Sequence, residues 1–71
     1  MTYYFVVNEQ GDRVRDKDGI DYIPFSDLTP HNFSDFAYKS EQAAQGEVRH
    51  YDPQGTYGLQ VVSRDVNLQL S

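Results

Sequence analysis

The absence of cysteine most constrains what this chain of 71 residues can fold into. It excludes a disulfide scaffold, a thiolate zinc site and a cysteine nucleophile. A chain this short buries only about 60% of its unfolded surface, so its stability is marginal unless a partner or a second copy helps. Ten Tyr and Phe residues are available to build a small core. We expect one domain over residues 1–71.

The N-terminal third of the chain has the pattern of short strands separated by polar turns. Tyr3–Val7 is aromatic and β-branched throughout, which predicts a strand with both faces at least partly covered. Two further strands are expected within 12–15 and 20–25, each preceded by a polar turn that contains glycine. Pro24 cannot donate to a neighbouring strand, so it places the last of these at a sheet edge or ends it early.

The periodicity between Thr29 and Gly46 predicts one helix. Thr29 suits the N-cap, Pro30 the first helical position, and Gly46 the left-handed residue after the last turn. The face with helical spacing comprises Phe33, Phe36, Ala37, Ser40 and Ala44. A competing interpretation starts a shorter helix at Ser40. The longer helix is favoured because both of its ends are explained.

A β-hairpin is expected after this helix. Residues 47–51 and 56–62 form its strands, and Asp52-Pro53-Gln54-Gly55 has the residue types of a β-turn. A last half-buried strand contains Val66, Leu68 and Leu70, after a bulge or turn near 63–65. The predicted fold is α+β: a small antiparallel sheet of five or six short strands, open or curled, with one helix on one face.

The core of this fold is expected between the helix and the sheet. The helix supplies Phe33, Phe36 and Ala44. The sheet supplies Phe5, Val7, Val61 and Leu68.

Charge and hydropathy exclude several classes of function. The formal charge of −5 disfavours direct binding to a phosphate backbone. No apolar run approaches the ~20 residues of a membrane span, and the start lacks the pattern of a secretion signal, so we expect a cytoplasmic protein without membrane contact. No glycine-flanked nucleophile and no glycine-rich phosphate loop is present, so we expect a protein that is not an enzyme.

Two patterns resemble metal sites but lack essential ligands. Residues 16–21 resemble part of a calcium loop, yet Val14 and Phe25 occupy its two end positions. His31 and His50 are nineteen residues apart, without the i+3 or i+4 spacing of a helical zinc site. We expect a polar turn at 16–21, packing or capping roles for the histidines, and no metal or cofactor.

Tyrosine and aspartate are the remaining candidates for binding. The six tyrosines exceed what so small a core can bury, and tyrosine is favoured at protein interfaces. Acidic residues concentrate around residues 12–21, where Arg13, Arg15 and Lys17 partly neutralise them. A solvated face explains such charges too, but an acidic patch can also steer association with a basic surface. The predicted partner-binding residues are Asp16, Asp18, Asp21, Tyr22 and Tyr57.

In length, charge and layout the chain resembles small phage-encoded anti-defence proteins, including anti-CRISPR inhibitors. The resemblance involves the strand Tyr3–Val7, the segment Ser40–Ala44 and the turn at residues 52–55. It implies a non-catalytic inhibitor that docks on a larger protein with a basic, nucleic-acid-binding surface. The alternative is a small structural or assembly subunit that forms a homodimer through a sheet edge.

Overall fold

Strand β1 (Thr2–Val7) is at the centre of the fold, and the other elements pack around it. The computed structural model describes residues 1–66, in which four strands form one open antiparallel sheet in the order β3-β2-β1-β4. The other elements are β2 (Arg13–Arg15), β3 (Tyr22–Pro24), the 3-10 turns η1 (Phe25–Asp27) and η2 (Phe33–Asp35), α1 (Glu41–Tyr51) and β4 (Gln60–Asp65). The α+β class is the predicted one, with four strands in place of five or six.

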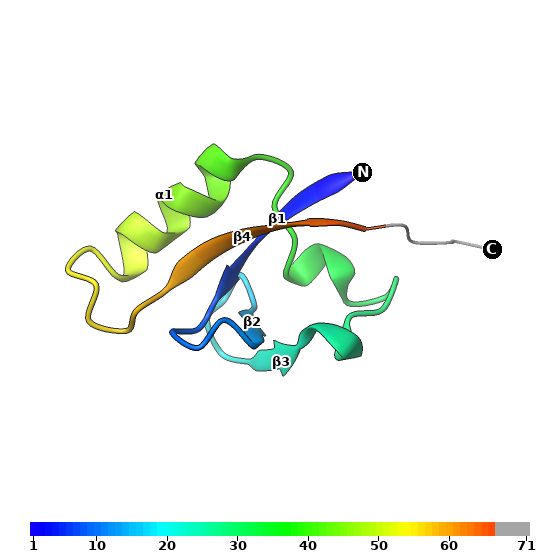
Figure 1. The fold of residues 1–71 in the computed structure, drawn as a ribbon, viewed down its shortest axis with the longest axis horizontal. Coiled ribbons are helices and arrows are strands. Elements are labelled where there is room, and N and C mark those ends of the chain that lie inside the picture. Colours follow the sequence, from blue (N-terminus) through cyan, green and yellow to red (C-terminus); the bar gives the residue numbers. More distant parts are fainter. Residues whose placement is uncertain (67–71) are drawn as a thin grey trace.

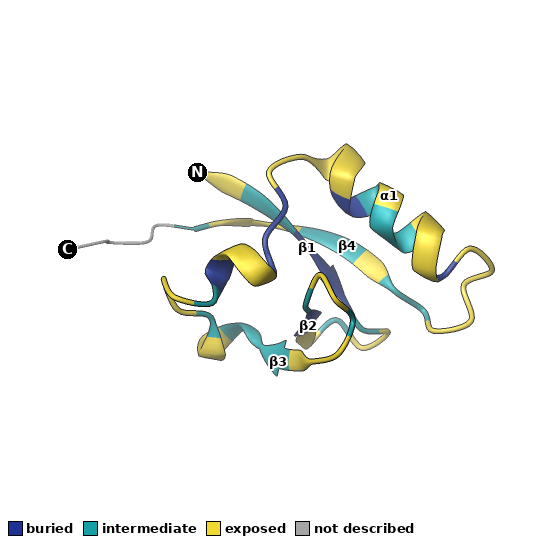
Figure 2. Ribbon diagram, turned by 180° about the vertical axis from the view of Figure 1, so that it is seen from behind, coloured by how far each residue is buried: buried dark blue, intermediate teal, exposed yellow. Residues whose placement is uncertain are grey.

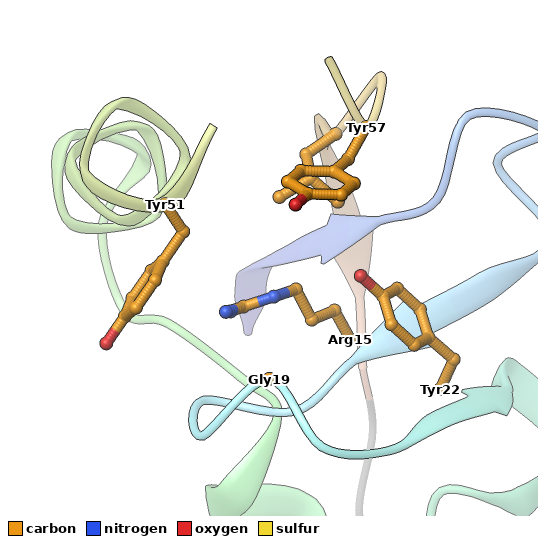
Figure 3. A pocket seen from close by; sticks show the side chains of 6 residues that line it. Arg15, Gly19, Tyr22, Tyr51 and Tyr57 are labelled. Atoms are coloured by element: carbon orange, nitrogen blue, oxygen red, sulfur yellow. The ribbon is translucent and has the colours of Figure 1, made fainter. Parts of the chain in front are cut away.

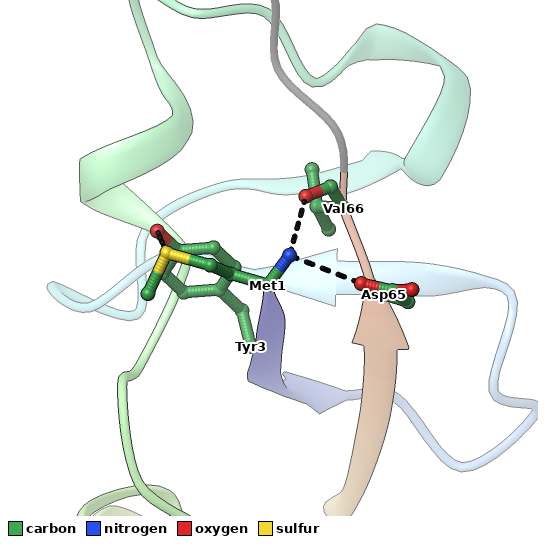
Figure 4. Close-up of polar contacts among 4 residues, drawn as sticks. All are labelled: Met1, Tyr3, Asp65 and Val66. Carbon is green, nitrogen blue, oxygen red and sulfur yellow. Dashed lines mark hydrogen bonds and ion pairs between the residues drawn. The ribbon is translucent and has the colours of Figure 1, made fainter.

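The longest ladder joins β1 to β4. Six residue pairs run from Thr2 opposite Asp65 to Val7 opposite Gln60. The pairing continues past the strands, since the Val66 amide donates to the Met1 carbonyl oxygen at 2.8 Å. The Met1 amino group also lies 3.1 Å from Oδ1 of Asp65 (Figure 4). The bulge or turn predicted near 63–65 is therefore wrong, because the ladder is regular across this segment.

Consecutive residues of β4, which point to opposite faces of the sheet, are both apolar because both faces of the central strands are covered. α1 lies on one face of β1 and β4, while β3 and the two 3-10 turns lie on the other side (Figure 1). The first face buries Val6, Tyr38 and Ala44, with Leu59 and Val61 beside them. The opposite face buries Phe5, Val7, Val14, Phe33, Phe36 and Ala37, with Val62 and Val66 beside them.

The predicted core is thus divided between two faces. Phe33 and Phe36 pack with Phe5 and Val7, as predicted, and edge-to-face contacts join the Phe5 ring to Phe33 and Phe25. Ala44 belongs to the other cluster. Buried residues lie along β1 and β2 at the centre of the molecule, and the connecting loops are mostly exposed (Figure 2). Leu68 and Leu70 lie outside the described residues.

The predicted helix from Thr29 to Gly46 is wrong, and the competing start at Ser40 is confirmed. Side chains of Thr29 and Asn32 each accept from the other's amide, which closes a local turn after Pro30. Tyr38 then pairs with Tyr4 through two 2.8 Å backbone hydrogen bonds, so the chain at this point extends the sheet and cannot be helical. Ser40 has extended backbone and accepts from the Ala43 amide at 3.2 Å, as an N-cap does.

The predicted hairpin over residues 47–62 is wrong, because residues 47–51 are helical and the strand that follows, β4, begins at Gln60 and pairs with β1. Residues 47–51 continue α1, because Ala44 and Val48 share one helix face and pack on β1 and β4. Gly46 is inside the helix and does not end it. The helix ends at Asp52, and Pro53 follows as a residue that cannot continue it. The turn at 52–55 is confirmed, with Gly55 at φ 71° and its amide donating to the Asp52 carbonyl oxygen.

No helix within residues 1–66 has the length and apolar character that crossing a bilayer requires.

Candidate partner-binding site

Two of the predicted binding residues meet in one recess of about 290 Å³. Tyr22, at the start of β3, and Tyr57, in the loop after α1, line it together with Tyr51 from the end of the helix (Figure 3). The Arg15 side chain lies between the three rings, and Gly19 and Leu59 complete the lining. Sheet, helix and two loops therefore all contribute to one site.

Arg15 is the buried charge of this site. It alternates with Val14 along β2, so it points away from the Phe5 cluster and towards the recess. Only 6% of the residue is exposed, its Nη1 donates to the Asp16 carbonyl oxygen at 3.2 Å, and its Cζ lies 4.6 Å from the Tyr51 ring centroid. Within residues 1–66, no ion pair to its guanidinium is present. The positive charge is thus held by a carbonyl and an aromatic face.

The loop between β2 and β3 forms one wall of the recess. Both carboxylate oxygens of Asp16 accept backbone hydrogens, from Ile20 at 2.9 Å and from Asp21 at 3.3 Å. Gly19 has φ 75°, a conformation that residues with a side chain rarely adopt, so glycine is favoured here. A β-carbon at this position would also displace Nη2, at the flexible end of the Arg15 side chain. The polar turn predicted for residues 16–21 is confirmed.

The three predicted aspartates have different positions in this loop. Asp16 is half-buried and its carboxylate holds the turn. Asp18 and Asp21 are exposed, beside the wall that Gly19 forms. Only these two carboxylates are therefore free to meet a partner.

The loop from Asp52 to Leu59 forms the opposite wall and carries Tyr57. Asp52 is buried, and its carboxylate accepts from the Tyr57 amide at 3.1 Å and from the Leu59 amide at 3.2 Å. Gly58 has φ 66°, and a β-carbon there would press on the Glu9 side chain. These contacts fix the backbone of Tyr57 while leaving 67% of the residue exposed.

Tyr38 lies close to this site but is buried. Only 8% of the residue is exposed, and its hydroxyl has no hydrogen-bond partner among the described residues. Burial, reinforced by the negative charge of Glu47, raises the pKa of Tyr38 to about 12, although Arg15 acts in the opposite direction. Tyr38 therefore stays neutral throughout the physiological range.

Of the two histidines, His50 lies beside this site, because its ring packs edge-to-face on the Tyr51 ring with the centroids 4.6 Å apart. His31 is in the exposed turn before η2, and His50 is in the last turn of α1, so its predicted place in a strand is wrong. Residues 1–66 contain no cluster of three His, Asp or Glu side chains that could hold a metal ion. A second recess, of about 390 Å³, is lined by Lys17, Phe33, Tyr38 and other residues, and by none of the predicted binding residues.

Arg15 and Tyr51 are the site residues that sequence reasoning missed. The sequence pattern treats Arg15 only as a charge that neutralises its acidic neighbours. Because Arg15 follows Val14 directly in β2, its side chain lies on the opposite face of the strand from that buried valine, and this was the available signal. Tyr51 was placed on a hairpin strand, so its position at the end of a helix could not be inferred.

A scan against protein-family models, a search of curated proteins and a search of solved structures each find no match to this chain.

Proposed function

We propose that this protein is a non-catalytic interaction module that docks on a basic surface of a larger protein. The observation that supports it is the gathering of Tyr22, Tyr51 and Tyr57 at one recess, each with more than a third of its surface exposed. Tyrosine provides large contact area with few rotatable bonds, so exposed tyrosines that share one site suit an interface.

The charge next to this recess favours a basic partner. Asp18 and Asp21 are exposed in the adjoining loop, and the whole chain carries a formal charge of −5. Acidic groups at the rim of an interface steer association with a positive surface more than they add to affinity. A nucleic-acid-binding protein presents such a surface, which agrees with the resemblance to anti-CRISPR inhibitors, and docking there would occlude its nucleic acid.

The test is the rate of association with a partner captured from a bacterial lysate, at two salt concentrations. The variant Asp18→Lys/Asp21→Lys should lower the association rate about tenfold or more at low salt, and much less at high salt, because exposed charges are screened beyond about 8–10 Å. Asp27→Lys/Glu41→Lys is the matched control, since it changes the net charge equally at two exposed residues, one in η1 and one in the first turn of α1, outside the 16–21 loop.

Unchanged kinetics for the first variant would contradict the proposal, as would an equal loss in both variants. Truncation of the exposed Tyr57 ring to alanine should instead speed dissociation, because ordered aromatic contacts act mainly on the off-rate.

A second candidate function is self-association through β4. In the described part of the chain, β4 pairs only with β1, so the outer edge of its six residues is unpaired. An edge of this kind can accept a strand from a second copy. Sedimentation equilibrium distinguishes the two functions, because a sheet-edge dimer should persist at high salt and survive the Asp18/Asp21 substitutions.

A further inference from the structure

Arg15 keeps hydrogen-bonding capacity that residues 1–66 do not use. A guanidinium carries five N–H donors, and one hydrogen bond is formed here, from Nη1 to the Asp16 carbonyl oxygen. No ion pair to Arg15 is present in the same part of the chain. These unused donors keep contact with solvent, because the Tyr38 hydroxyl is the only fully buried side-chain polar atom without a partner among the described residues. The remaining donors lie beside a recess of about 290 Å³, close to the lower end of ordinary ligand pockets.

The lining of the recess adds aromatic surfaces and further donors. Three tyrosine rings surround the guanidinium (Figure 3). The hydroxyls of Tyr22 and Tyr57 lie on the side of the recess and can donate to an anion, whereas the Tyr51 hydroxyl points away from Arg15. Gly19 lies against Nη2, where a β-carbon would displace the flexible end of the Arg15 side chain from its place in the recess. Tyr51 and the Asp16 carbonyl fix the orientation of the guanidinium before a ligand arrives.

The geometry points to a binding site for a small oxyanion, a carboxylate or phosphate carried on a flat ring, in the recess around Arg15. The guanidinium fork pairs with two oxygens of such a group, and the tyrosine rings contact its ring. This site shares the three tyrosines with the proposed docking of a basic protein, and the two functions differ in the charge that they use. Docking depends on the exposed Asp18 and Asp21, whereas anion binding depends on Arg15.

The aspartates of the neighbouring loop do not prevent anion binding. The Asp16 carboxylate is already engaged by two backbone N–H groups, and Asp18 and Asp21 are exposed to screening by salt. Arg15 acts at short range inside the recess, where its field is stronger than that of exposed charges.

The test is an NMR titration of the 15N-labelled protein with phenyl phosphate, benzoate, inorganic phosphate and benzyl alcohol at constant ionic strength. We expect saturable shifts at the amides of Gly19, Tyr57 and Leu59 with phenyl phosphate or benzoate. Whichever of these two binds tighter identifies the oxyanion. Inorganic phosphate should bind more weakly because it lacks the ring, and benzyl alcohol should cause no saturable shift.

Arg15→Gln should weaken binding of the tighter probe about tenfold or more, because a neutral amide replaces the charged fork. Arg13→Gln is the matched control: Arg13 has the same parity on β2, is exposed and does not line the recess, so its loss should change affinity less than twofold. If Arg15→Gln fails to fold, Tyr57→Ala replaces it, because this exposed ring can be removed without loss of the core. The inference is overturned if neither phenyl phosphate nor benzoate gives saturable shifts, or if benzyl alcohol binds as tightly as they do. It is also overturned if Arg13→Gln loses as much affinity as Arg15→Gln, or as Tyr57→Ala where Arg15→Gln does not fold.

Discussion

In each of the two loops that line the recess, an aspartate carboxylate accepts two backbone hydrogen bonds, but the spacing of the donor amides along the chain differs. Asp16 is half-buried and accepts from two consecutive amides, those of Ile20 and Asp21. Asp52 is buried and accepts from two separated amides, those of Tyr57 and Leu59. One carboxylate thus closes a short turn between strands, while the other holds a longer loop against the end of a helix.

A third loop shows that a single oxygen is enough for consecutive amides. Oδ1 of Asn8 accepts from both Asp12 and Arg13 in the turn between β1 and β2. Backbone N–H groups that are separated along the chain need two acceptor oxygens that point apart. An asparagine side chain cannot supply them, because one of its two terminal atoms is an NH₂ donor. Asp16 uses both of its oxygens, but its two amides are consecutive, so we expect a single acceptor oxygen to suffice there and not at Asp52.

The largest effect is expected from Asp52→Ala. Two hydrogen bonds to a buried charged group are lost, and the backbone donors of Tyr57 and Leu59 lose their acceptor. The free energy of unfolding should fall by about 2–4 kcal/mol, measured by urea denaturation. Asp52→Asn should recover less than half of this loss. A loss below about 1 kcal/mol for Asp52→Ala would show that the loop is held by other contacts.

Tyr38 provides a test of the packing between the 16–21 loop and α1. Nζ of Lys17 lies 5.1 Å from its ring centroid, and its side chain belongs to the buried cluster of Val6 and Ala44. The folded state keeps the Tyr38 proton up to a pKa of about 12, whereas the unfolded chain releases it near 10. Stability is fully present below pH 10 and falls between pH 10 and 12, by about 1.4 kcal/mol per pH unit from this group.

Tyr38→Phe should remove this slope. At pH 7 it should be neutral or stabilising by up to about 1 kcal/mol, because the hydroxyl has no partner in the described part of the chain. The measurement is urea denaturation of both proteins at several pH values. Equal slopes for the two proteins above pH 10 would refute the assignment of the raised pKa to this hydroxyl.

The smallest effect is expected from Asp16. Asp16→Ala should cost about 1 kcal/mol, since the acceptor is partly solvated and water can replace it. Asp16→Asn should be nearly neutral, in contrast to Asp52→Asn. If both asparagine variants lose the same stability, the difference drawn between consecutive and separated amides is wrong.

The strands of the first third could be predicted because local pattern and tertiary pairing agree there. The run Tyr3–Val7 and the edge position implied by Pro24 needed no knowledge of the rest of the chain. Residues 29–55 were misassigned because tertiary contacts overrode local periodicity. Pairing of Tyr38 with Tyr4 ends the helical pattern early, and burial of Ala44 and Val48 against the sheet carries α1 through Gly46.

The binding site was predictable only in part for the same reason. Exposed tyrosines could be suspected from their number, and the structure brings Tyr22 and Tyr57 to one recess. The place of Arg15 between the rings depends on Tyr51 ending a helix beside β2, a relation that no local pattern of residues reveals.

The two loops and the end of α1 bring three tyrosines around a buried Arg15. Nuclear Overhauser effects test this arrangement most directly. We predict cross-peaks between the Arg15 side-chain protons and the ring protons of Tyr51, together with slow hydrogen exchange of the Tyr57 and Leu59 amides, whose exchange should quicken in Asp52→Ala. Absence of these cross-peaks, with fast exchange of both amides in the unmodified protein, would contradict the account.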